Sequence, residues 1–258
     1  MAKPINNERR NSLVQYVLNQ KKATVIELAE KFNVSTETIR KDLLYLDQNN
    51  ILLKGHGVVS VTNSYLENEF AIKETENTAA KIQIAKRAAA QIPENCVIFL
   101  DSGTTALQLA KILNLRKDLI IVSNSALISQ ISATSNNQIL IAGGELRKKS
   151  FSYVGHWALQ SLQQIHIDIA FLSCSGFHSD GPSIHSYREL EIKQTVIENS
   201  HKTILIADTN KFNKESLYRY ATFSAFDLFI PERQLSKQEK ERFPHTLNIL
   251  EDESSAAE

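Results

Sequence analysis

Residues 23–57 read ATVIELAEKFNVSTETIRKDLLYLDQNNILLKGHG, and this stretch decides the fold of the N-terminal part of the chain. Thr24 is followed three residues later by Glu27, the spacing of a capping box in which two residues satisfy each other's backbone amides at a helix start. From there, apolar residues recur every three or four positions, which predicts a helix with one buried stripe. The stripe consists of Val25, Leu28, Ala29 and Phe32.

A second helix is predicted directly after a short break at Asn33 and Val34, because Ser35 is a favourable N-cap. Ile39, Leu43 and Leu46 form its apolar stripe, and the residues outside the stripe are hydroxylated or charged. A helix that packs by one face and presents such groups near its N-terminus is typical of a recognition helix in the DNA major groove.

The next segment, ILLKGHGVV at residues 51–59, has two short apolar runs around a glycine-rich turn, which predicts a β-hairpin. The order helix, turn, helix, hairpin is that of a winged helix-turn-helix, and we predict such a DNA-binding domain over residues 6–61. A small helical interaction module with solvated charged faces is the alternative. The predicted contacts to double-stranded operator DNA come from Thr24, Ser35, Thr36, Glu37, Thr38, Arg40, Lys41, Lys54 and His56.

Length and charge indicate two domains. A chain of 258 residues has room for a small DNA-binding domain and one larger core. Residues 1–62 hold nine Lys and Arg against six Asp and Glu, whereas residues 63–258 hold twenty against twenty-three. An excess of three positive charges is modest, so tight DNA binding requires two or more copies of the domain acting together. We therefore expect a homo-oligomer.

Several other classes of protein are disfavoured by the sequence. Cys96 and Cys174 lie in apolar runs, which favours buried, reduced thiols over a disulfide. No apolar run reaches the roughly 18–20 residues that cross a bilayer, and no signal-type segment is present, so we expect a cytoplasmic protein without a membrane partner. The seven histidines show no metal-ligand spacing, and we expect neither a metal nor a cofactor.

An α/β fold is predicted for residues 78–250, after a linker over residues 62–77. A helix starts at Thr78, and short apolar runs then alternate with helical segments. Runs without polar alternation are typical of strands buried on both faces, which indicates a mainly parallel sheet covered by helices. The predicted strands are residues 97–100, 119–122, 139–141, 169–172 and 204–207.

Each predicted strand ends in small, polar or charged residues, and ligands of open α/β sheets bind at the carboxyl ends of the strands. Residues 102–105, Ser-Gly-Thr-Thr, lead directly into a helix, so amides and hydroxyls converge there as in a phosphate site. Helix capping at 102–105, a tight turn at 143–144 and a solvated loop at 147–149 are the structural alternatives. The predicted effector-binding residues are Asp101, Ser102, Gly103, Thr104, Thr105, Ser123, Asn124, Ser125, Gly143, Gly144, Arg147, Asp208 and Lys211.

The pattern Val34-Ser35-x-x-Thr38-Ile39-Arg40-Lys41-Asp42-Leu43-x-x-Leu46, followed by Gly55-His56-Gly57, resembles the DeoR family of bacterial sugar-metabolism regulators. The resemblance continues at residues 100–105, 123–125, 143–147 and 208–212 and covers about residues 5–235. It implies Arg40 and Lys41 at the DNA, a sensor domain resembling ribose-5-phosphate isomerase, a phosphorylated sugar as effector, and oligomers on operator DNA. Residues 172–176 and 232–234 are similar to the L-fucose operon activator branch, and residues 196–200 to the glycerol-3-phosphate repressor branch.

The sequence therefore predicts a transcriptional regulator of a carbohydrate-utilisation operon, whose DNA binding is modulated by a phosphorylated sugar, and not an enzyme. A sugar-phosphate isomerase-like enzyme fused to a DNA-binding domain is the alternative, since Asp101 or Asp208 with Lys211 could move protons beside a bound aldose. A DNA-binding structural protein without a ligand is a third possibility, disfavoured by the five polar strand ends.

Overall fold

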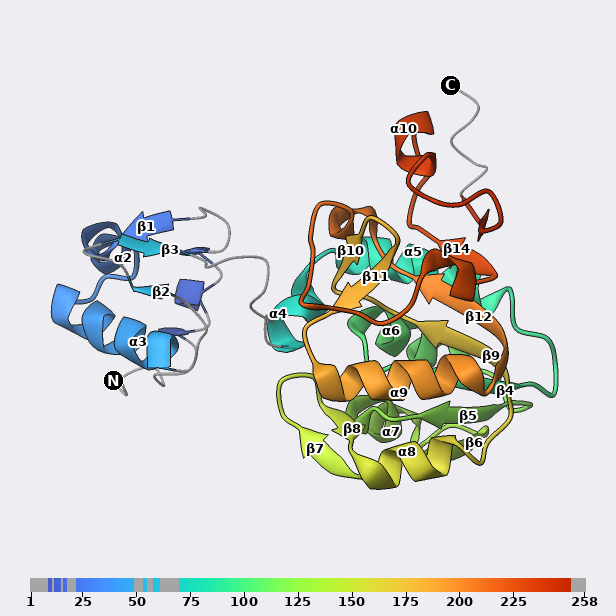
Figure 1. Ribbon diagram of the computed structural model, residues 1–258. Coiled ribbons are helices and arrows are strands. Elements are labelled where there is room, and N and C mark those ends of the chain that lie inside the picture. Colours follow the sequence, from blue (N-terminus) through green and yellow to red (C-terminus); the bar gives the residue numbers. More distant parts are fainter. Residues whose placement is uncertain are drawn as a thin grey trace. The chain divides into compact units, whose positions relative to one another are not determined.

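The computed structural model describes residues 9–10, 12–14, 16–17, 22–48, 53–54, 58–60 and 70–251. The chain forms two compact units, Met1–Asn68 and Glu69–Glu258, which we call the headpiece and the sensor unit (Figure 1).

The headpiece contains the predicted helix-turn-helix and hairpin. Helical residues at 9–10, 12–14 and 16–17 precede α2 (Val25–Lys31) and α3 (Thr36–Gln48). Strands β2 (Leu53–Lys54) and β3 (Val58–Ser60) pair antiparallel, as predicted, and β3 also pairs with β1 (Lys22–Thr24). Strand β1 was not predicted, because three residues are too few to show an alternating pattern.

Both predicted helix starts are confirmed. The Thr24 hydroxyl accepts a hydrogen bond from the Glu27 amide at 3.2 Å, and the Glu27 carboxylate accepts one from the Thr24 amide at 2.7 Å. The Ser35 hydroxyl accepts a hydrogen bond from the Thr38 amide at 3.1 Å. Ile39 and Leu43 in α3 are buried, so its predicted apolar stripe is confirmed as well.

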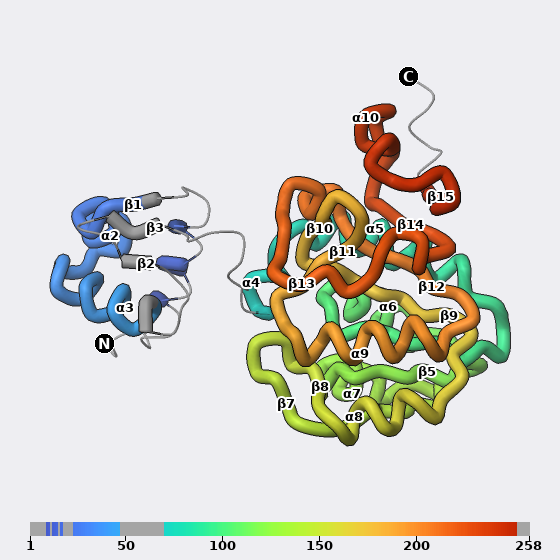
Figure 2. Tube along the Cα trace, in the orientation of Figure 1, coloured from blue at the N-terminus to red at the C-terminus, as the bar shows by residue number. Residues whose placement is uncertain are grey.

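A seven-stranded parallel sheet in the order β15-β14-β12-β9-β4-β5-β6 forms the centre of the sensor unit. The strand that comes first in the sequence, β4, lies in the interior of this sheet. The chain then adds β5 and β6 on one side of β4, and β9, β12, β14 and β15 on the other (Figure 2). All five predicted strands are present. The strands are β4 (Val97–Leu100), β5 (Ile120–Ser123), β6 (Gln138–Ile141), β9 (Ile167–Leu172), β12 (Ser200–Ile206), β14 (Leu228–Ile230) and β15 (Asn248–Ile249).

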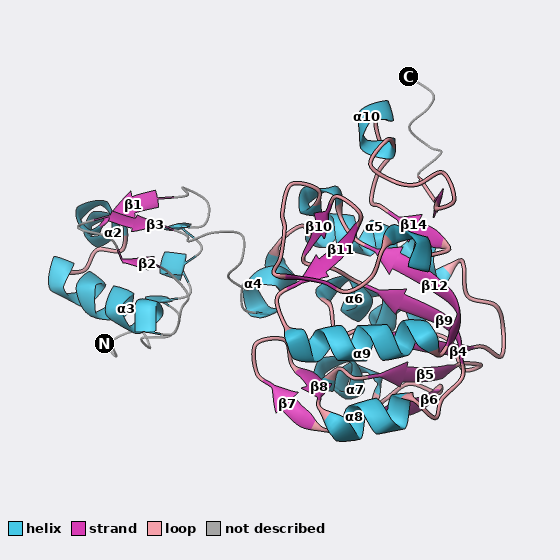
Figure 3. Ribbon diagram, viewed as in Figure 1, coloured by secondary structure: helices cyan, strands magenta, loops and turns pink. Residues whose placement is uncertain are grey.

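Helices cover both faces of this sheet, and an apolar core lies between the sheet and the helices on each face (Figure 3). One core includes α5 (Thr78–Ala89), α6 (Thr104–Leu113) and α7 (Ala126–Ser132). The other includes α8 (His156–Leu162) and α9 (Tyr187–Glu198). The predicted fold class, a winged helix-turn-helix followed by a larger α/β domain, is confirmed.

Smaller elements lie around the main sheet. Strands β7 (Glu145–Arg147) and β8 (Ser152–Val154) form a hairpin, and β10 (Gly176–His178), β11 (Gly181–Ile184) and β13 (Tyr218–Arg219) form an antiparallel sheet. Three short helices also lie in this unit: the 3-10 helices η1 (Thr209–Lys211) and η2 (Phe223–Ala225), and the helix α10 (Lys237–Lys240).

The range predicted as a linker, residues 62–77, contains the helix α4 (Phe70–Thr75), which belongs to the sensor unit. Phe70 and Ile72 of this helix are buried. The linker prediction was therefore too long at its C-terminal side, because six residues are too few for a helical period to be visible.

Neither cysteine forms a disulfide, and Cys174 is only partly buried, unlike Cys96. Within the described ranges, no helix is long and apolar enough to cross a membrane.

Candidate DNA-binding and effector sites

The exposed face of α3 carries most of the predicted DNA-binding residues. Glu37, Arg40 and Lys41 are exposed, and Thr36 and Thr38 are partly exposed. The Arg40 side chain is 56% exposed, and its guanidinium lies 3.8 Å from the Glu37 carboxylate. An exposed pair of this kind contributes little to stability, so exchanging it for a DNA phosphate costs little.

Two predicted DNA-binding residues have structural roles. Thr24 and Ser35 cap α2 and α3, and the Ser35 hydroxyl also lies 2.9 Å from that of Thr38. Lys54 is at the end of β2, but its side chain is outside the described residues, as is all of His56.

An ion-pair cluster that the sequence did not predict holds α3 in place. Asp42 of α3 is 2% exposed, and its carboxylate accepts hydrogen bonds from Arg9 at 2.7 Å and Arg10 at 2.9 Å. The Arg10 guanidinium also lies 3.9 Å from the centre of the Tyr45 ring. The preceding helical segment is thereby joined to the helix that carries Arg40 and Lys41.

In the sensor unit, the predicted effector residues lie at the ends of four strands of the main sheet. Strands β4, β5 and β6 are neighbours, and β9 separates β4 from β12. Lys211 and Asp208 follow β12, residues 101–105 follow β4, and the other predicted residues follow β5 and β6. All these strands are parallel, so their carboxyl ends form one edge. The strand order reverses between β4 and β9, the position at which ligands bind in open α/β sheets.

A buried charge pair lies at this reversal. Asp101, at the end of β4, accepts hydrogen bonds from the Lys193 ammonium at 2.6 Å and from the amide of Ser173, after β9, at 3.0 Å. The Ser173 hydroxyl also donates to this carboxylate. The side chains of Lys193 and Asp101 are 5% and 3% exposed. Lys193 further contacts the Ser173 carbonyl oxygen at 3.0 Å and lies 5.0 Å from the centre of the Tyr220 ring.

The turn before α6 is packed tightly against this pair. A Cβ atom at Gly103 would lie 2.8 Å from Cβ of Ser173 and collide with its hydroxyl, so only glycine fits here. Gly103 is the N-cap of α6 and provides no side-chain cap. The first amides of this ten-residue helix therefore lack the usual side-chain acceptor, which leaves a position suited to an anion. The alternative for residues 102–105, that they serve only to cap the next helix, is not supported, because no side chain caps α6 at Gly103.

Further charged groups gather around Cys174. Cys174 is partly exposed as a whole residue, but protein atoms surround its thiol, and the loss of water there raises the pKa of the thiol to about 12. The ammonium groups of Lys211 and Lys193 oppose the shift, and the carboxylates of Asp208 and Asp101 add to it. The ends of β4, β9 and β12 thus share one group of charges.

Lys81 of α5 belongs to the same group of charges and is 3% exposed. Burial and the nearby ammonium of Lys211 lower the pKa of Lys81 to about 8, and the carboxylate of Asp208 opposes this shift. Asp208 is itself buried and accepts a hydrogen bond from the Asn77 amide group at 3.1 Å.

Ser123, the last residue of β5, and the two residues after it hydrogen-bond mostly to other parts of the sensor unit. The Ser123 hydroxyl donates to the Leu100 carbonyl oxygen at 2.7 Å, and the Ser125 hydroxyl caps α7 by accepting from the Ile128 amide at 3.3 Å. Asn124 is 1% exposed and donates to the Tyr153 carbonyl oxygen at 3.0 Å. Its side-chain oxygen has no hydrogen-bond partner among the described residues, which leaves an acceptor at this edge.

Gly144 and Arg147 also have internal contacts. A Cβ atom at Gly144 would lie 2.6 Å from the Val154 carbonyl oxygen, so close packing accounts for this glycine, whereas Gly143 has open space. The Arg147 guanidinium donates to the Ser150 hydroxyl at 2.9 Å and lies 3.6 Å from the Glu189 carboxylate. Arg147 therefore joins the β7–β8 hairpin to α9.

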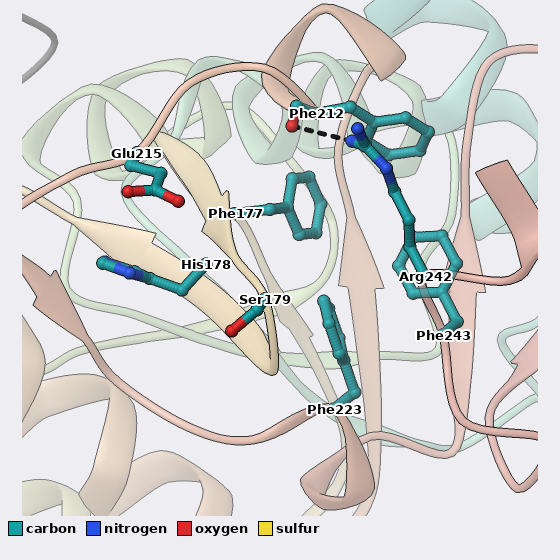
Figure 4. Close-up of a pocket in the computed structure, with 8 residues that line it drawn as sticks. All are labelled: Phe177, His178, Ser179, Phe212, Glu215, Phe223, Arg242 and Phe243. Carbon is teal, nitrogen blue, oxygen red and sulfur yellow. Dashed lines mark hydrogen bonds between the residues drawn. The ribbon is translucent and has the colours of Figure 1, made fainter. Parts of the chain in front are cut away.

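A separate pocket of about 330 Å³ lies beside the small antiparallel sheet (Figure 4). Phenylalanine rings form much of its wall, and Arg242 donates to the Phe212 carbonyl oxygen at 2.9 Å across one side. None of the predicted effector residues lines it. The lining residues are Phe177, His178, Ser179, Phe212, Glu215, Phe223, Arg242 and Phe243.

Comparison with known proteins assigns both units. Residues 9–65 match the DeoR-like helix-turn-helix domain, and residues 76–233 match the DeoR C terminal sensor domain. The chain is 32% identical over 222 residues to the glycerol-3-phosphate regulon repressor of Escherichia coli (strain K12), covering 85% of this chain and 88% of that protein. It is also 32% identical over 232 residues to the L-fucose operon activator of Haemophilus influenzae, covering 89% and 93%.

Among solved structures, ribose 5-phosphate isomerase A from Methanocaldococcus jannaschii matches 53% of this chain and 55% of that chain, with 16% identity and a TM-score of 0.39. Because the chain is equally identical to the repressor and to the activator, these two matches do not decide between the glycerol-3-phosphate repressor branch and the L-fucose operon activator branch. Both matched domains, in this order and over most of the residues, show that the chain belongs to the DeoR family of transcriptional regulators.

Proposed function

We propose that the protein regulates a carbohydrate-utilisation operon and that a phosphorylated sugar, bound at the strand ends of the sensor unit, modulates its binding to operator DNA. The observation that carries the effector site is the turn at residues 101–105. There the uncapped start of α6 lies beside Asp101. Amides at a helix start suit a phosphate, and a buried carboxylate suits sugar hydroxyl groups.

The positive charges near this turn support an anionic ligand. Lys81, Lys193 and Lys211 come from three separate elements and act on the same group of residues. Lys193 is neutralised by Asp101, whereas Lys81 and Lys211 raise each other's electrostatic energy. A dianionic phosphate relieves that repulsion.

DNA reading is proposed for the exposed face of α3, with Arg40 and Lys41 at phosphates or base edges. Each headpiece reads one half-site, and a homo-oligomer in the cytoplasm brings two headpieces to one operator. The relatives named for a regulon repressor and an operon activator support control of transcription and leave its direction open.

A thermal-shift series with phosphorylated sugars tests the effector site. At a concentration 100-fold above Kd, the matching compound is expected to raise the Tm of the sensor unit by about 5–10 °C. L-Fuculose 1-phosphate and glycerol 3-phosphate are the first compounds, with L-fuculose and glycerol as controls. Thr104→Val removes one hydroxyl donor and is expected to weaken binding about tenfold.

Thr195→Val is the matched control, because Thr195 is as buried as Thr104 but lies on α9, outside the predicted site. Equal affinity in the Thr104→Val and Thr195→Val variants would reject the proposed position of the phosphate.

The affinity for the phosphorylated effector is also expected to depend on pH. The pKa of Lys81 in the free protein is about 8, in an environment that includes Lys211, Asp208, Glu76 and Glu74. A bound phosphate favours the protonated form, so above pH 8 binding must take up a proton. Between pH 7 and pH 9 the affinity is therefore expected to fall about tenfold, since the phosphate is already dianionic in this range.

Calorimetric titration at pH 7, 8 and 9 measures this fall, and Lys81→Met is expected to bind weakly with little pH dependence. A pH-independent affinity in the unaltered protein would exclude Lys81 from the site.

We propose no enzymatic activity. The Asp101 carboxylate oxygen that would act as a base accepts from Lys193 and twice from Ser173, which leaves it poorly placed to take a substrate proton. Turnover of pentose or hexose phosphates that disappears in Lys211→Ala would overturn this proposal.

A further inference from the structure

Helix α4 is the first helix or strand of the sensor unit. It begins at Phe70, and the headpiece ends two residues earlier, at Asn68. The chain from the DNA-binding unit therefore enters the sensor unit through this helix. It has only six residues, and a helix of that length is not stable by itself in water. Its order depends on the contacts that hold its two ends.

The C-terminal end of α4 is held by Lys81. The Lys81 ammonium donates to the Glu76 carbonyl oxygen at 2.5 Å and also to that of Lys73. Carbonyl oxygens at a helix end have no partner within the helix, and a cation there is favoured by the helix dipole. The next residue, Asn77, has a positive φ of 51° and donates to the Asp208 carboxylate at 3.1 Å.

The N-terminal end of α4 is held by the turn after β7. The Phe70 amide donates to the Lys149 carbonyl oxygen at 3.2 Å, and the rings of Phe70 and Phe151 meet edge to face with centres 5.9 Å apart. Arg147, which joins this hairpin to α9, is the last residue of β7, directly before that turn. Both ends of α4 are thus fastened to segments that carry predicted effector residues.

Lys81 connects α4 with the effector residues. Its ammonium binds the carbonyl oxygens at the end of α4, and its backbone amide donates at 3.1 Å to the carbonyl oxygen of Asn77, whose side chain donates to Asp208. The charges of Lys211 and Asp208 also act on the Lys81 ammonium. A hydrogen bond to a phosphate dianion is stronger than one to a neutral carbonyl oxygen. A dianion near the C-terminal end of a helix also opposes the helix dipole. Both effects act in the same direction, against the bonds that hold α4.

We propose that Lys81 couples the effector site to the headpiece: a bound phosphate draws the Lys81 ammonium away from the carbonyl oxygens of Lys73 and Glu76, so that α4 loosens where the headpiece chain enters. Because the coupling needs a phosphorylated ligand at the strand ends, it rests on the proposed function. The ligand binds the loosened arrangement more tightly, as any ligand-driven change requires.

Hydrogen–deuterium exchange of the full chain tests the coupling, with glycerol 3-phosphate and L-fuculose 1-phosphate as probes. In the unaltered protein, the probe that binds is expected to protect residues 101–105 and to speed exchange at residues 70–77 at least about tenfold. Two charged hydrogen bonds are lost, and one alone accounts for about that factor. In Lys81→Met, exchange at 70–77 is expected to be fast without any probe and unchanged by it.

Lys111→Met is the matched control, because Lys111 lies on α6 with its ammonium 4.0 Å from Glu74 of the same helix α4. In Lys111→Met, the probe is expected to speed exchange at residues 70–77 as much as it does in the unaltered protein. Asn77→Gly is a second variant, since glycine accepts the positive φ and only the bond to Asp208 is lost. It is expected to speed exchange at 70–77 without a probe.

The outcomes separate the coupling from the proposed function. Protection at 101–105 without faster exchange at 70–77 would reject the coupling alone. Exchange at 70–77 that is as slow in Lys81→Met as in the unaltered protein would reject it too. No protection at 101–105 with any phosphorylated probe would reject the proposed effector and the coupling together.

Discussion

Lys193→Met is expected to lower the free energy of unfolding of the sensor unit by about 3–5 kcal/mol, because it leaves the buried carboxylate of Asp101 without its cation. The pair is almost fully buried, so water cannot replace the lost ammonium. Methionine fills a similar volume, and little of the cost arises from a cavity. Urea unfolding followed by the fluorescence of Trp157, the single tryptophan of the chain, measures the change within the sensor unit.

The double variant Lys193→Met with Asp101→Asn is expected to recover part of the loss, because the amide carries no charge that needs a partner. Lys237→Met, at an exposed position on α10, is the control and is expected to change the free energy of unfolding by less than about 0.5 kcal/mol. A loss in Lys193→Met no larger than in this control would contradict the importance of the buried pair.

The two lysines that sequence reasoning missed had a visible signal. Lys193 occurs with Ile192 and Val196 on the buried side of α9, and Lys81 occurs with Ile84 on the buried side of α5. A lysine on an apolar stripe must be paired or functional, since an isolated buried charge is costly. The helix that starts at Thr78 was predicted from its apolar stripe without a role for Lys81, and no helix was predicted over the residues of α9.

Strand ends could be predicted because a buried parallel strand and the polar residues after it are local features of the chain. Which strand ends are neighbours depends on the strand order, and no local pattern sets that order. The contact of Asp101 with Ser173 and Lys193 spans 72 and 92 residues in the sequence. Such pairing follows from the reversal between β4 and β9, which only the folded sheet shows.

Other features were beyond sequence reasoning for the same physical reason. The bonds from Arg9 and Arg10 to Asp42 join residues more than 30 positions apart, and α4 is shorter than two helical turns. The caps at Thr24 and Ser35, in contrast, involve residues three positions apart, and both were predicted correctly. Local hydrogen bonds were therefore predictable, whereas contacts that tie distant segments together were not.

Operator affinity is expected to fall by about 10³–10⁵ between 50 and 200 mM salt, the loss for a protein that contacts 6–10 phosphates. Two headpieces on one operator supply that number of contacts, because a single headpiece has a small basic excess. The operator is first selected from a pool of random DNA duplexes with the purified protein. Binding of the selected duplex is then measured by fluorescence anisotropy over this range of salt.

Arg40→Ala is expected to weaken operator binding at least about tenfold, because the exposed guanidinium would give up only a weak surface pair with Glu37 to reach the DNA. If Arg40 contacts phosphates, the salt dependence becomes shallower by about one counterion per headpiece and all duplexes are weakened alike. If it reads a base, the selected sequence loses its preference at one position. Lys31→Ala, at the end of α2 and outside the predicted contacts, is the control. Binding that is insensitive to salt and to Arg40→Ala would remove α3 from the DNA interface.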